Sequence, residues 1–501
     1  MPRPPTSAAM SLARKFAIGV AVTFLLLLLI IAWLARGNIA DLSVAAVAGT
    51  DPVLAEPEPE TIPTVQIAEP IGWAEGEQPV AAEGLAVARF AEGLESPRVI
   101  YTLPNGDVLV ALARSPARDA AVEDDGLFAK LRGAVESYLF SKAGSAGPSP
   151  NQIVLLRDAD SDGRAEQRQV LLDGLASPSG MAWRDGTLYV ANHDALLAFP
   201  YDLGQTRLTA APRKLMDLPA GGGHWMRNIA ISPDGGTIYV AVGSASNIGE
   251  QGMEIEEGRA AVWRYDLGAG RQSLFAAGLR NPNGLAFSPW SGELWTTVNE
   301  RDMLGSDLVP DYLTNVPVGA QYGWPWVYWR DNIDRRVEAP MPRFLTEYAR
   351  KPEYALGPHV AALGLVFSEE GARLGQQFAS GAIIARRGSW NRKPPSGYDV
   401  VYVPFDARGN PQGKPVPILS GWLTGEGTTR GRPTWVEWAG DGALLVSDDT
   451  AGIVWRVTAP GAMPAAPIRQ LTGRRLPPPR ELRDPQAEFE ADYVREQGLV
   501  R

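Results

Sequence analysis

Short apolar runs separated by turns rich in Gly, Pro and Asp dominate the chain from about residue 86 to about residue 460. Six times, a polar loop leads into an apolar strand, a tight turn and a second apolar strand. The six loops begin at Gly93, Gly174, Gly221, Gly278, His359 and Arg430. Their spacing of about 50 to about 80 residues exceeds the roughly 40–50 of regular propeller repeats, which leaves room for inserted loops. The pattern predicts an all-β, six-bladed β-propeller over residues 86–460.

The alternative architecture is a pair of β-sandwiches whose turns recur by coincidence. We favour the propeller because the same motif recurs at the same place in every unit. A composition with 45% hydrophobic residues, 53 Gly and 42 Pro also favours an all-β core with many turns over a helical bundle.

The first apolar run is of a different kind. Residues 16–35 are uncharged and rich in Leu, and as a helix with a rise of about 1.5 Å per residue they span roughly 30 Å, one hydrocarbon core. Basic residues precede the run, so we expect a cytoplasmic N-terminus at 1–15, a transmembrane anchor at 16–36 and a periplasmic propeller tethered to the inner membrane. The alternative is a cleaved signal peptide, whose apolar region is usually only about 7–15 residues long.

The segments that flank the propeller lack periodicity. Residues 37–85 are rich in Pro, Glu and Ala, which predicts an extended linker. Residues 461–501 form a tail rich in Pro and charged residues, to which we assign no function.

Charge and cysteine content exclude several function classes. The net charge of −10 argues against a nucleic-acid partner. The absence of Cys excludes disulfides, Cys-ligated zinc, iron–sulfur clusters and c-type haem attachment. Hydrolase-elbow, dinucleotide-binding, Walker A and zincin motifs are also missing from the sequence. With only three His in the chain, each one carries more weight than usual.

The predicted symmetry locates a site, because equivalent loops of all blades converge at one end of a propeller. At its centre we place the stretch Gly221–Asn228, which combines a flexible glycine run with His224 as a proton acceptor. The loops carry Arg98, Ser179, His224 with Arg227, Arg280 with Asn281 and Asn283, His359, and Arg430 with Arg432. The second-strand ends add Asn192, Ser244, residues 299–302, Arg386 with Arg387, and Asp448 with Asp449. Such a ring of cations and amides suits a planar, polyanionic ligand.

Five pieces in order resemble one family: His224 with Arg227, residues 280–287, residues 322–325, residues 388–392, and Arg430-x-Arg432. On these motifs, residues 86–460 resemble the sugar dehydrogenases that depend on pyrroloquinoline quinone (PQQ). The sorbosone (aldose) dehydrogenase branch is more similar than the soluble glucose dehydrogenase type.

The resemblance implies that His224 is the general base, that Arg280 is a second catalytic residue at a position that holds the quinone, and that PQQ and calcium are the cofactors. It also implies a set of residues that contact the cofactor. These are Arg98, Arg227, Asn281, Asn283, His359, Arg386, Arg387, Arg430 and Arg432. It also implies that calcium is held by backbone carbonyls at Arg301 and Asp302. Calcium prefers such oxygen ligands.

Three features depart from the family pattern. The glucose-oxidising type orients its His with a carboxylate, whereas the matching position here is Ser244. The calcium segment at 299–302 lacks the Gly-Pro of that type. His359 is either a cofactor contact or a core residue. Separately, Asp158, Asp160 and Asp162 start like a calcium loop, but Gln169 stands where such a loop ends in Glu, so we expect a tight hairpin there.

The predicted function is PQQ-dependent oxidation of an aldose or related sugar, with electrons passed to a separate acceptor, either the quinone pool or a cytochrome. One alternative is a calcium-dependent lactonase that uses Asn299, Glu300 and Asp448. The other is a non-catalytic, membrane-tethered binding propeller.

Overall fold

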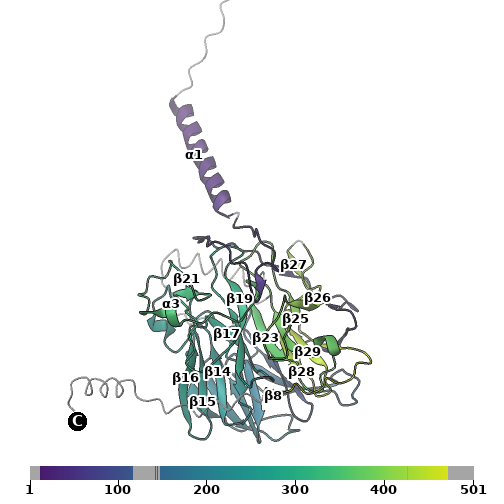
Figure 1. Cartoon of the computed structure of the whole chain (residues 1–501). Helices are drawn as coiled ribbons and strands as arrows, with labels where there is room; N and C mark the ends of the chain where they lie inside the picture. Colours follow the sequence, from purple (N-terminus) through teal and green to yellow (C-terminus); the bar gives the residue numbers. More distant parts are fainter. Residues whose placement is uncertain are drawn as a thin grey trace, which may run out of the picture.

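The computed structural model describes residues 12–35, 37–116, 142, 144, 147–425 and 427–471. Its main body is a ring of six antiparallel sheets (Figure 1). The inner strands β5, β9, β13, β17, β23 and β28 contact one another in this order, and β28 contacts β5. This closed ring confirms the six-bladed propeller and excludes the pair of sandwiches.

The first three blades come in chain order. Blade 1 contains β5 (Pro97–Thr102), β6 (Val108–Leu112), β7 (Gln152–Arg157) and β8 (Gln167–Leu172). Blade 2 contains β9 (Gly180–Arg184), β10 (Thr187–Ala191), β11 (Ala195–Pro200) and β12 (Arg213–Asp217). Blade 3 contains β13 (Ile229–Ile231), β14 (Thr237–Val242), β15 (Ala261–Asp266) and β16 (Arg271–Ala277), with the 3-10 turn η2 (Glu254–Glu256) before β15.

Blades 4 and 5 each gain a short fifth strand from the N-terminal region. Blade 4 contains β17 (Asn281–Phe287), β18 (Leu294–Asn299), β19 (Pro310–Asn315), β22 (Tyr354–Pro358) and β1 (Ala48–Gly49). Its insertion carries β20 (Val327–Tyr328), β21 (Asn332–Ile333) and α3 (Leu345–Tyr348). Blade 5 contains β23 (Ala362–Phe367), β24 (Gly381–Arg386), β25 (Asp399–Pro404), β26 (Val416–Ser420) and β3 (Val80–Ala81), with the 3-10 turn η3 (Gln376–Phe378).

Blade 6 joins the two ends of the propeller. It contains β28 (Pro433–Trp438), β29 (Leu444–Asp448), β30 (Ile453–Thr458) and, as its outer strand, β4 (Ala86–Ala91). Val454–Thr458 pair antiparallel with residues of β4. The core lies between successive blades, where strands such as β6 are buried along their whole length. Burial on both sheet faces explains why these strands are continuous apolar runs rather than alternating ones.

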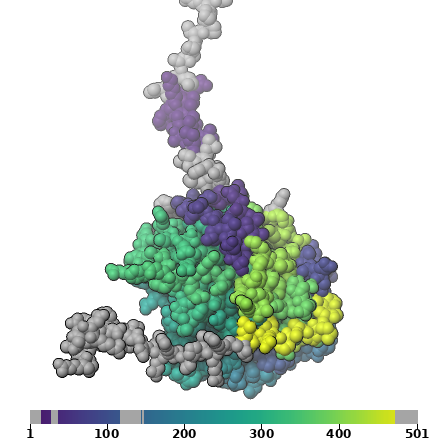
Figure 2. Space-filling view, viewed as in Figure 1, coloured from purple at the N-terminus to yellow at the C-terminus, as the bar shows by residue number. Residues whose placement is uncertain are grey.

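Residues 37–85, which we call the strap, pack against the propeller although they contain few regular elements. Asp41 and Leu42 donate their N–H groups to Asp307 Oδ2 at 2.7 and 2.8 Å. Val47 and Ala48 are completely buried, and β2 (Glu69–Pro70) pairs with β27 (Thr428–Thr429). Figure 2 shows the strap, in purple, across the upper surface of the propeller. The extended segment is therefore an integral part of the domain rather than a free linker.

Helix α1 (Leu12–Ala35) rises from the side of the molecule on which the strap lies (Figure 1). Within the described residues, no helix meets the combined length and apolarity that crossing a membrane requires. The predicted anchor is thus not confirmed.

Candidate functional site

Arg227 holds the loop that carries His224 in place. This side chain is completely buried and donates from Nη1 to the carbonyls of His224 (2.8 Å) and Met226 (3.0 Å) and from Nη2 to that of Pro219 (2.7 Å). Burial lowers the pKa of Arg227 to about 9, so the guanidinium remains charged near neutral pH. The predicted cofactor contact of Arg227 is replaced by these bonds to its own loop.

His224 is held as a neutral imidazole with one free nitrogen. Its Nδ1 lies 2.9 Å from the carbonyl oxygen of Ser244 and 3.0 Å from Ser244 Oγ. Because a carbonyl can only accept, we assign the ring hydrogen to Nδ1, which leaves the lone pair on Nε2. Burial, reinforced by the charge of Arg280, lowers the pKa of His224 to about 3. The predicted pairing of His224 with position 244 is confirmed.

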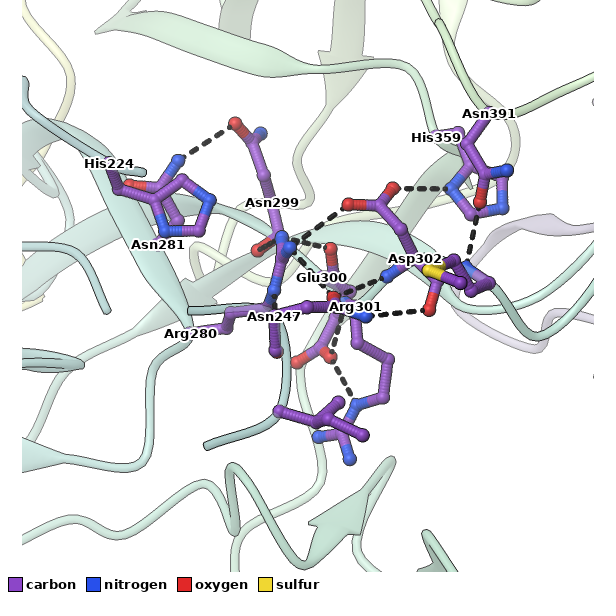
Figure 3. A network of polar contacts seen from close by, with 12 residues as sticks. His224, Asn247, Arg280, Asn281, Asn299, Glu300, Arg301, Asp302, His359 and Asn391 are labelled. Carbon is purple, nitrogen blue, oxygen red and sulfur yellow. Dashed lines mark hydrogen bonds and ion pairs between the residues drawn. The ribbon is translucent and has the colours of Figure 1, made fainter. Parts of the chain in front are cut away.

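Amide side chains border His224 (Figure 3). A Cβ atom at Gly243 would lie 2.4 Å from Asn281 Oδ1 and 2.6 Å from His224 Cβ, so only Gly allows these two residues to lie side by side. Asn281 Nδ2 donates to Asn299 Oδ1 at 3.3 Å, and Asn283 Nδ2 donates to the Asn281 carbonyl at 3.0 Å. Asn281 thus lies beside His224 and Asn283 is buried, while their contacts with the cofactor stay predictions.

A second group of residues, the Asp302 network, comprises Asn247, Arg280, Asp302, Arg336 and His359. Arg280 Nη2 donates to Asp302 Oδ2 and to Asn247 Oδ1, both at 2.9 Å. On the other side of the carboxylate, His359 Nδ1 lies 3.3 Å from Asp302 Oδ1 (Figure 3). His359 Nε2 lies 3.0 Å from the Gly305 carbonyl. Both ring nitrogens of His359 therefore face acceptors.

Within this network, Asp302 and His359 each favour the charged form of the other. Burial raises the pKa of Asp302, but Arg280 and His359 outweigh it, so the net shift is downward. Burial lowers the pKa of His359, but the hydrogen bond and charge of Asp302 outweigh it, so the net shift is upward. His359 is a buried member of an internal ion pair. This position agrees with the core alternative rather than with a cofactor contact.

One of the two carbonyls predicted to hold calcium, that of Asp302, already accepts hydrogen bonds from other side chains. Asp302 O accepts from Asn247 Nδ2 and from Arg336 Nη1, both at 3.0 Å, and the neighbouring Glu300 O accepts from Arg280 Nη1 at 2.5 Å. Arg301 is completely buried, and its guanidinium donates to the carbonyls of Pro325 and Val327. Positive guanidinium groups on the Glu300 and Asp302 oxygens repel a divalent cation. The Asp302 carbonyl is therefore unsuited to calcium, and the calcium contact of the Arg301 carbonyl stays a prediction.

A third group, the Asp449 cluster, comprises Arg98, Arg387, Arg432 and Asp449. Asp449 Oδ2 accepts from Arg98 Nη1 at 2.5 Å and from Arg387 Nε at 2.9 Å. Burial raises the pKa of Asp449, but Arg387, Arg98 and Arg432 outweigh it and lower the value to about 2. Burial lowers the pKa of Arg98 to about 10, so it stays charged. Two guanidinium groups thus donate to one carboxylate, and the charge of Arg432 acts on it as well.

This cluster keeps spare hydrogen-bonding capacity. The Nε groups of Arg98 and Arg432 are buried and have no partner. The neighbouring carboxylate, Asp448, accepts from the indoles of Trp422 and Trp73 at 2.7 and 3.0 Å. Even with Asp448 ionised, positive charge is in surplus. A surplus with unpaired buried donors fits an anionic ligand.

Arg386 and Arg430 lie outside the Asp449 cluster. Arg386 makes a bidentate pair with Asp399, at 2.7 and 2.5 Å, and donates to the Leu356 carbonyl. Arg430 makes a bidentate pair with Glu77 of the strap, with both bonds at 3.1 Å. The predicted cofactor contacts of Arg386 and Arg430 are replaced by these pairs. Of the two arginines left open at 386 and 387, only Arg387 joins the cluster.

Arg98 connects the Asp449 cluster to the His224 loop. Its Nη2 lies 2.9 Å from Met226 Sδ, and its guanidinium carbon lies 5.3 Å from the Trp225 ring. Contacts in the site therefore run between blades 5, 6, 1 and 3, which confirms that the equivalent loops converge at one end of the ring. The sequence interpretation missed the roles of Asn247, Arg336 and Glu256. It named Asp449 only as a residue at the end of a second strand. Asp449 is equivalent by the propeller symmetry to the other second-strand ends, and this equivalence was the signal that could have identified it as a site residue.

The acidic loop between β7 and β8 is a tight turn. Carboxylate oxygens of Asp158, Asp160, Asp162 and Glu166 lie within 4.8 Å of one another. Backbone N–H groups of Asp162 and Gly163 donate to Asp158. The predicted hairpin is confirmed, and calcium binding there stays a prediction.

The chain matches a known protein family. The TrAA12-like family model matches residues 153–317 and 344–460, which is more than half of the chain. By structure, a Trichoderma reesei protein of Carbohydrate-Active Enzymes Family AA12 superposes with a TM-score of 0.61 at 20% identity, covering 76% of this chain and 97% of that protein. The PQQ domain of pyranose dehydrogenase from Coprinopsis cinerea gives a TM-score of 0.58 at 21% identity, covering 78% and 100%. At such low sequence identity, these two structures support the propeller fold alone.

Curated relatives match over shorter lengths. An uncharacterized protein of Borreliella burgdorferi is 27% identical over 238 residues, which is 47% of this chain and 60% of the relative. The PQQ-dependent pyranose dehydrogenase of Coprinopsis cinerea is 33% identical over 136 residues, 23% of this chain and 18% of the enzyme. The chain thus spans less than two thirds of these relatives. On the family match, this protein belongs to the TrAA12-like family, and its relatives include PQQ-dependent sugar dehydrogenases, as its motifs predicted.

Proposed function

We propose that this protein oxidises an aldose or a related sugar with PQQ as the hydride acceptor. The observation that carries the proposal is the juxtaposition of the Asp449 cluster, which has surplus positive charge, with a neutral His224 whose Nε2 is free. Arg98 pairs with Asp449 and also contacts Met226 on the loop that carries His224. A cationic cradle next to a proton acceptor is what a polyanionic redox cofactor and a hydroxyl substrate require.

The Asp449 cluster would hold the cofactor. PQQ is a planar quinone with several carboxylates, and when bound it supplies the two-electron chemistry of the reaction. Arg98, Arg387 and Arg432 offer charge-assisted hydrogen bonds to such carboxylates. The unpaired Nε groups of Arg98 and Arg432 give the cluster donors that Asp449 alone does not satisfy.

His224 would take the proton from the sugar hydroxyl at Nε2. Its Nδ1–H bond to Ser244 fixes the ring, and the charge of Arg280 helps to keep it neutral. Arg280 itself is bound on all sides by Asn247, Glu300 and Asp302, so its part is electrostatic and positional. Asn281, beside His224, is the closest amide for orienting a hydroxyl group.

The finer assignments are part of the proposal. The name of the Coprinopsis cinerea relative, a pyranose dehydrogenase, supports a sugar substrate, and our motif resemblance favours the sorbosone or aldose type. Because the sequence has no haem motif, electrons pass to a separate acceptor, the quinone pool or a cytochrome. The apolar run at 16–35, with basic residues before it, supports an inner-membrane anchor and a periplasmic propeller.

The calcium-lactonase alternative is disfavoured by the contacts of its candidate ligands. Glu300 accepts from Arg301, Asp448 accepts from two indoles, and Asn299 Nδ2 donates to the Ala362 carbonyl at 2.7 Å. These three side chains are committed to different partners rather than to one metal.

Reconstitution tests the proposed function. Purified protein is mixed with PQQ, and dye reduction is followed with a panel of aldoses while quinone absorbance reports binding. We expect bound quinone and sugar-dependent dye reduction, and Arg387→Gln should weaken binding. A protein that retains no quinone and reduces no dye with any sugar would exclude the proposal and leave the binding-propeller alternative.

A further inference from the structure

Ser244 is fixed on every side. It is completely buried, and its N–H donates to the Arg280 carbonyl at 2.8 Å. Its hydroxyl donates to the Ser246 carbonyl at 2.7 Å. Since this bond uses the only hydroxyl hydrogen, Ser244 Oγ faces His224 Nδ1–H as an acceptor. Both oxygens of Ser244 therefore specify the same tautomer of His224.

A buried carboxylate holds the residues next to Ser244. Glu256, at the end of η2, accepts the N–H groups of Ala245 and Ser246 at 2.7 and 2.9 Å. It also accepts the Ser246 hydroxyl at 2.5 Å. Three donors on one buried carboxylate fix the chain at 245–246, and so fix the carbonyl that receives the Ser244 hydroxyl.

The His224 loop docks on these same residues. Gly223 N–H donates to the Ala245 carbonyl at 2.7 Å. Gly222 has a φ of +80°, and a Cβ atom there would lie 2.6 Å from Ala245 Cα. Gly222 is therefore required by close contact with the segment that Glu256 holds.

We propose that Ser244, supported by Glu256, is the residue that orients His224 as proton acceptor, so that a neutral oxygen pair replaces an orienting carboxylate. This inference rests on the proposed function for the identity of the reaction, but the geometry it describes exists without cofactor or substrate. Ser244 and Glu256 are positioning residues, because they act through His224.

The replacement has a chemical consequence. A carboxylate on Nδ1 would stabilise the imidazolium, whereas a hydroxyl and a carbonyl do so only weakly. Arg280 and Arg227 also disfavour a proton on His224, and Asp302 is the charged group that favours one. Ser244 therefore keeps His224 free to accept a proton in acidic solution.

Histidine NMR tests the orientation directly, because the chain has only three His. We would label the full-length protein with ¹⁵N-histidine and follow ring nitrogens against pH. For His224 we expect hydrogen on Nδ1, none on Nε2, and no protonation down to about pH 4. Ser244→Asp should raise its titration by about one pH unit or more. Ser368→Ala is the matched control, since Ser368 is equally buried and donates to the Phe378 carbonyl, away from the site.

Hydrogen on Nε2 in the unsubstituted protein would overturn the proposal, and so would a Ser244→Asp protein that titrates like Ser368→Ala. The NMR measurement needs no dehydrogenase activity. A protein that proved inactive after reconstitution would therefore contradict the proposed function without contradicting the orientation of His224.

Glu256 is tested by Glu256→Gln, with Ser246→Ala as a milder variant that keeps the carboxylate. If the reaction is as proposed, we expect kcat to fall about tenfold with KM and PQQ binding little changed, and both His224 tautomers to appear. Asp107→Asn is the control, because Asp107 is a buried carboxylate paired with Arg157 elsewhere in the propeller. A single, unchanged tautomer in both variants would remove Glu256 from the proposal.

Discussion

The Asp449 cluster and the Asp302 network both pair arginine with a carboxylate, but they differ in how completely their donors are satisfied. In the Asp449 cluster, Arg98 and Arg387 donate to one carboxylate, Arg432 adds its charge, and the Nε groups of Arg98 and Arg432 have no partner. In the Asp302 network, Arg280 and His359 flank Asp302, and the guanidinium of Arg280 also contacts Asn247 and Glu300. The comparison shows that unpaired buried donors, rather than the presence of arginine, distinguish a candidate ligand site from scaffold.

His224 gives the largest expected effect, because it adjoins the Asp302 network and faces the ligand. His224→Gln should lower kcat by roughly 10²–10⁴-fold, the usual contribution of a positioned general base. PQQ binding, measured by absorbance after gel filtration, should be unchanged, since the Asp449 cluster is intact. If kcat and PQQ retention fell equally, His224 and the Asp449 cluster would not act independently of each other.

Asp302→Asn tests whether the Asp302 network is scaffold. Removing one partner of a buried ion pair should lower the free energy of unfolding by about 3–5 kcal/mol, as measured by urea denaturation. The raised pKa of His359 means that its pairing stabilises the protein below pH 6.5 and that this contribution is lost as pH rises through the folded value. Asp302→Asn should remove this pH dependence. Unchanged stability would contradict a structural role.

Arg387→Gln and Arg386→Gln form a matched pair on adjacent positions. Arg387→Gln should weaken PQQ binding by about tenfold to a hundredfold, the range of a charge-assisted hydrogen bond. Arg386→Gln breaks the pair with Asp399 and should lower stability without altering PQQ affinity, as titrated by fluorescence. If Arg386→Gln weakened PQQ binding and Arg387→Gln did not, the cofactor would be held by Arg386 rather than by Arg387.

Metal removal should have the smallest effect. Because guanidinium groups occupy the carbonyls at Glu300 and Asp302, treatment with EDTA should leave PQQ affinity and dye reduction unchanged. Activity that is lost on chelation and restored by added calcium would show that the Asp302 network opens to admit a cation.

The repeat pattern predicted the ring, the converging loops and the position of His224, because blade cores impose regular apolar strands. It did not separate Arg386 from Arg387. Neighbouring residues at a strand end point in different directions, and only the three-dimensional partners, Asp399 and Asp449, tell them apart. Nor did it predict the strap, whose contacts with Asp307 and Arg430 join residues more than 250 positions apart without any local periodicity.

The pairing of β4 with β30 has a consequence for how the protein is made. These strands are about 360 residues apart in sequence, and contacts of such long range form slowly. During synthesis the ring cannot close until residue 458 has left the ribosome. The blade completed last supplies Arg432 and Asp449, so a nascent or C-terminally truncated chain should be unable to load its cofactor.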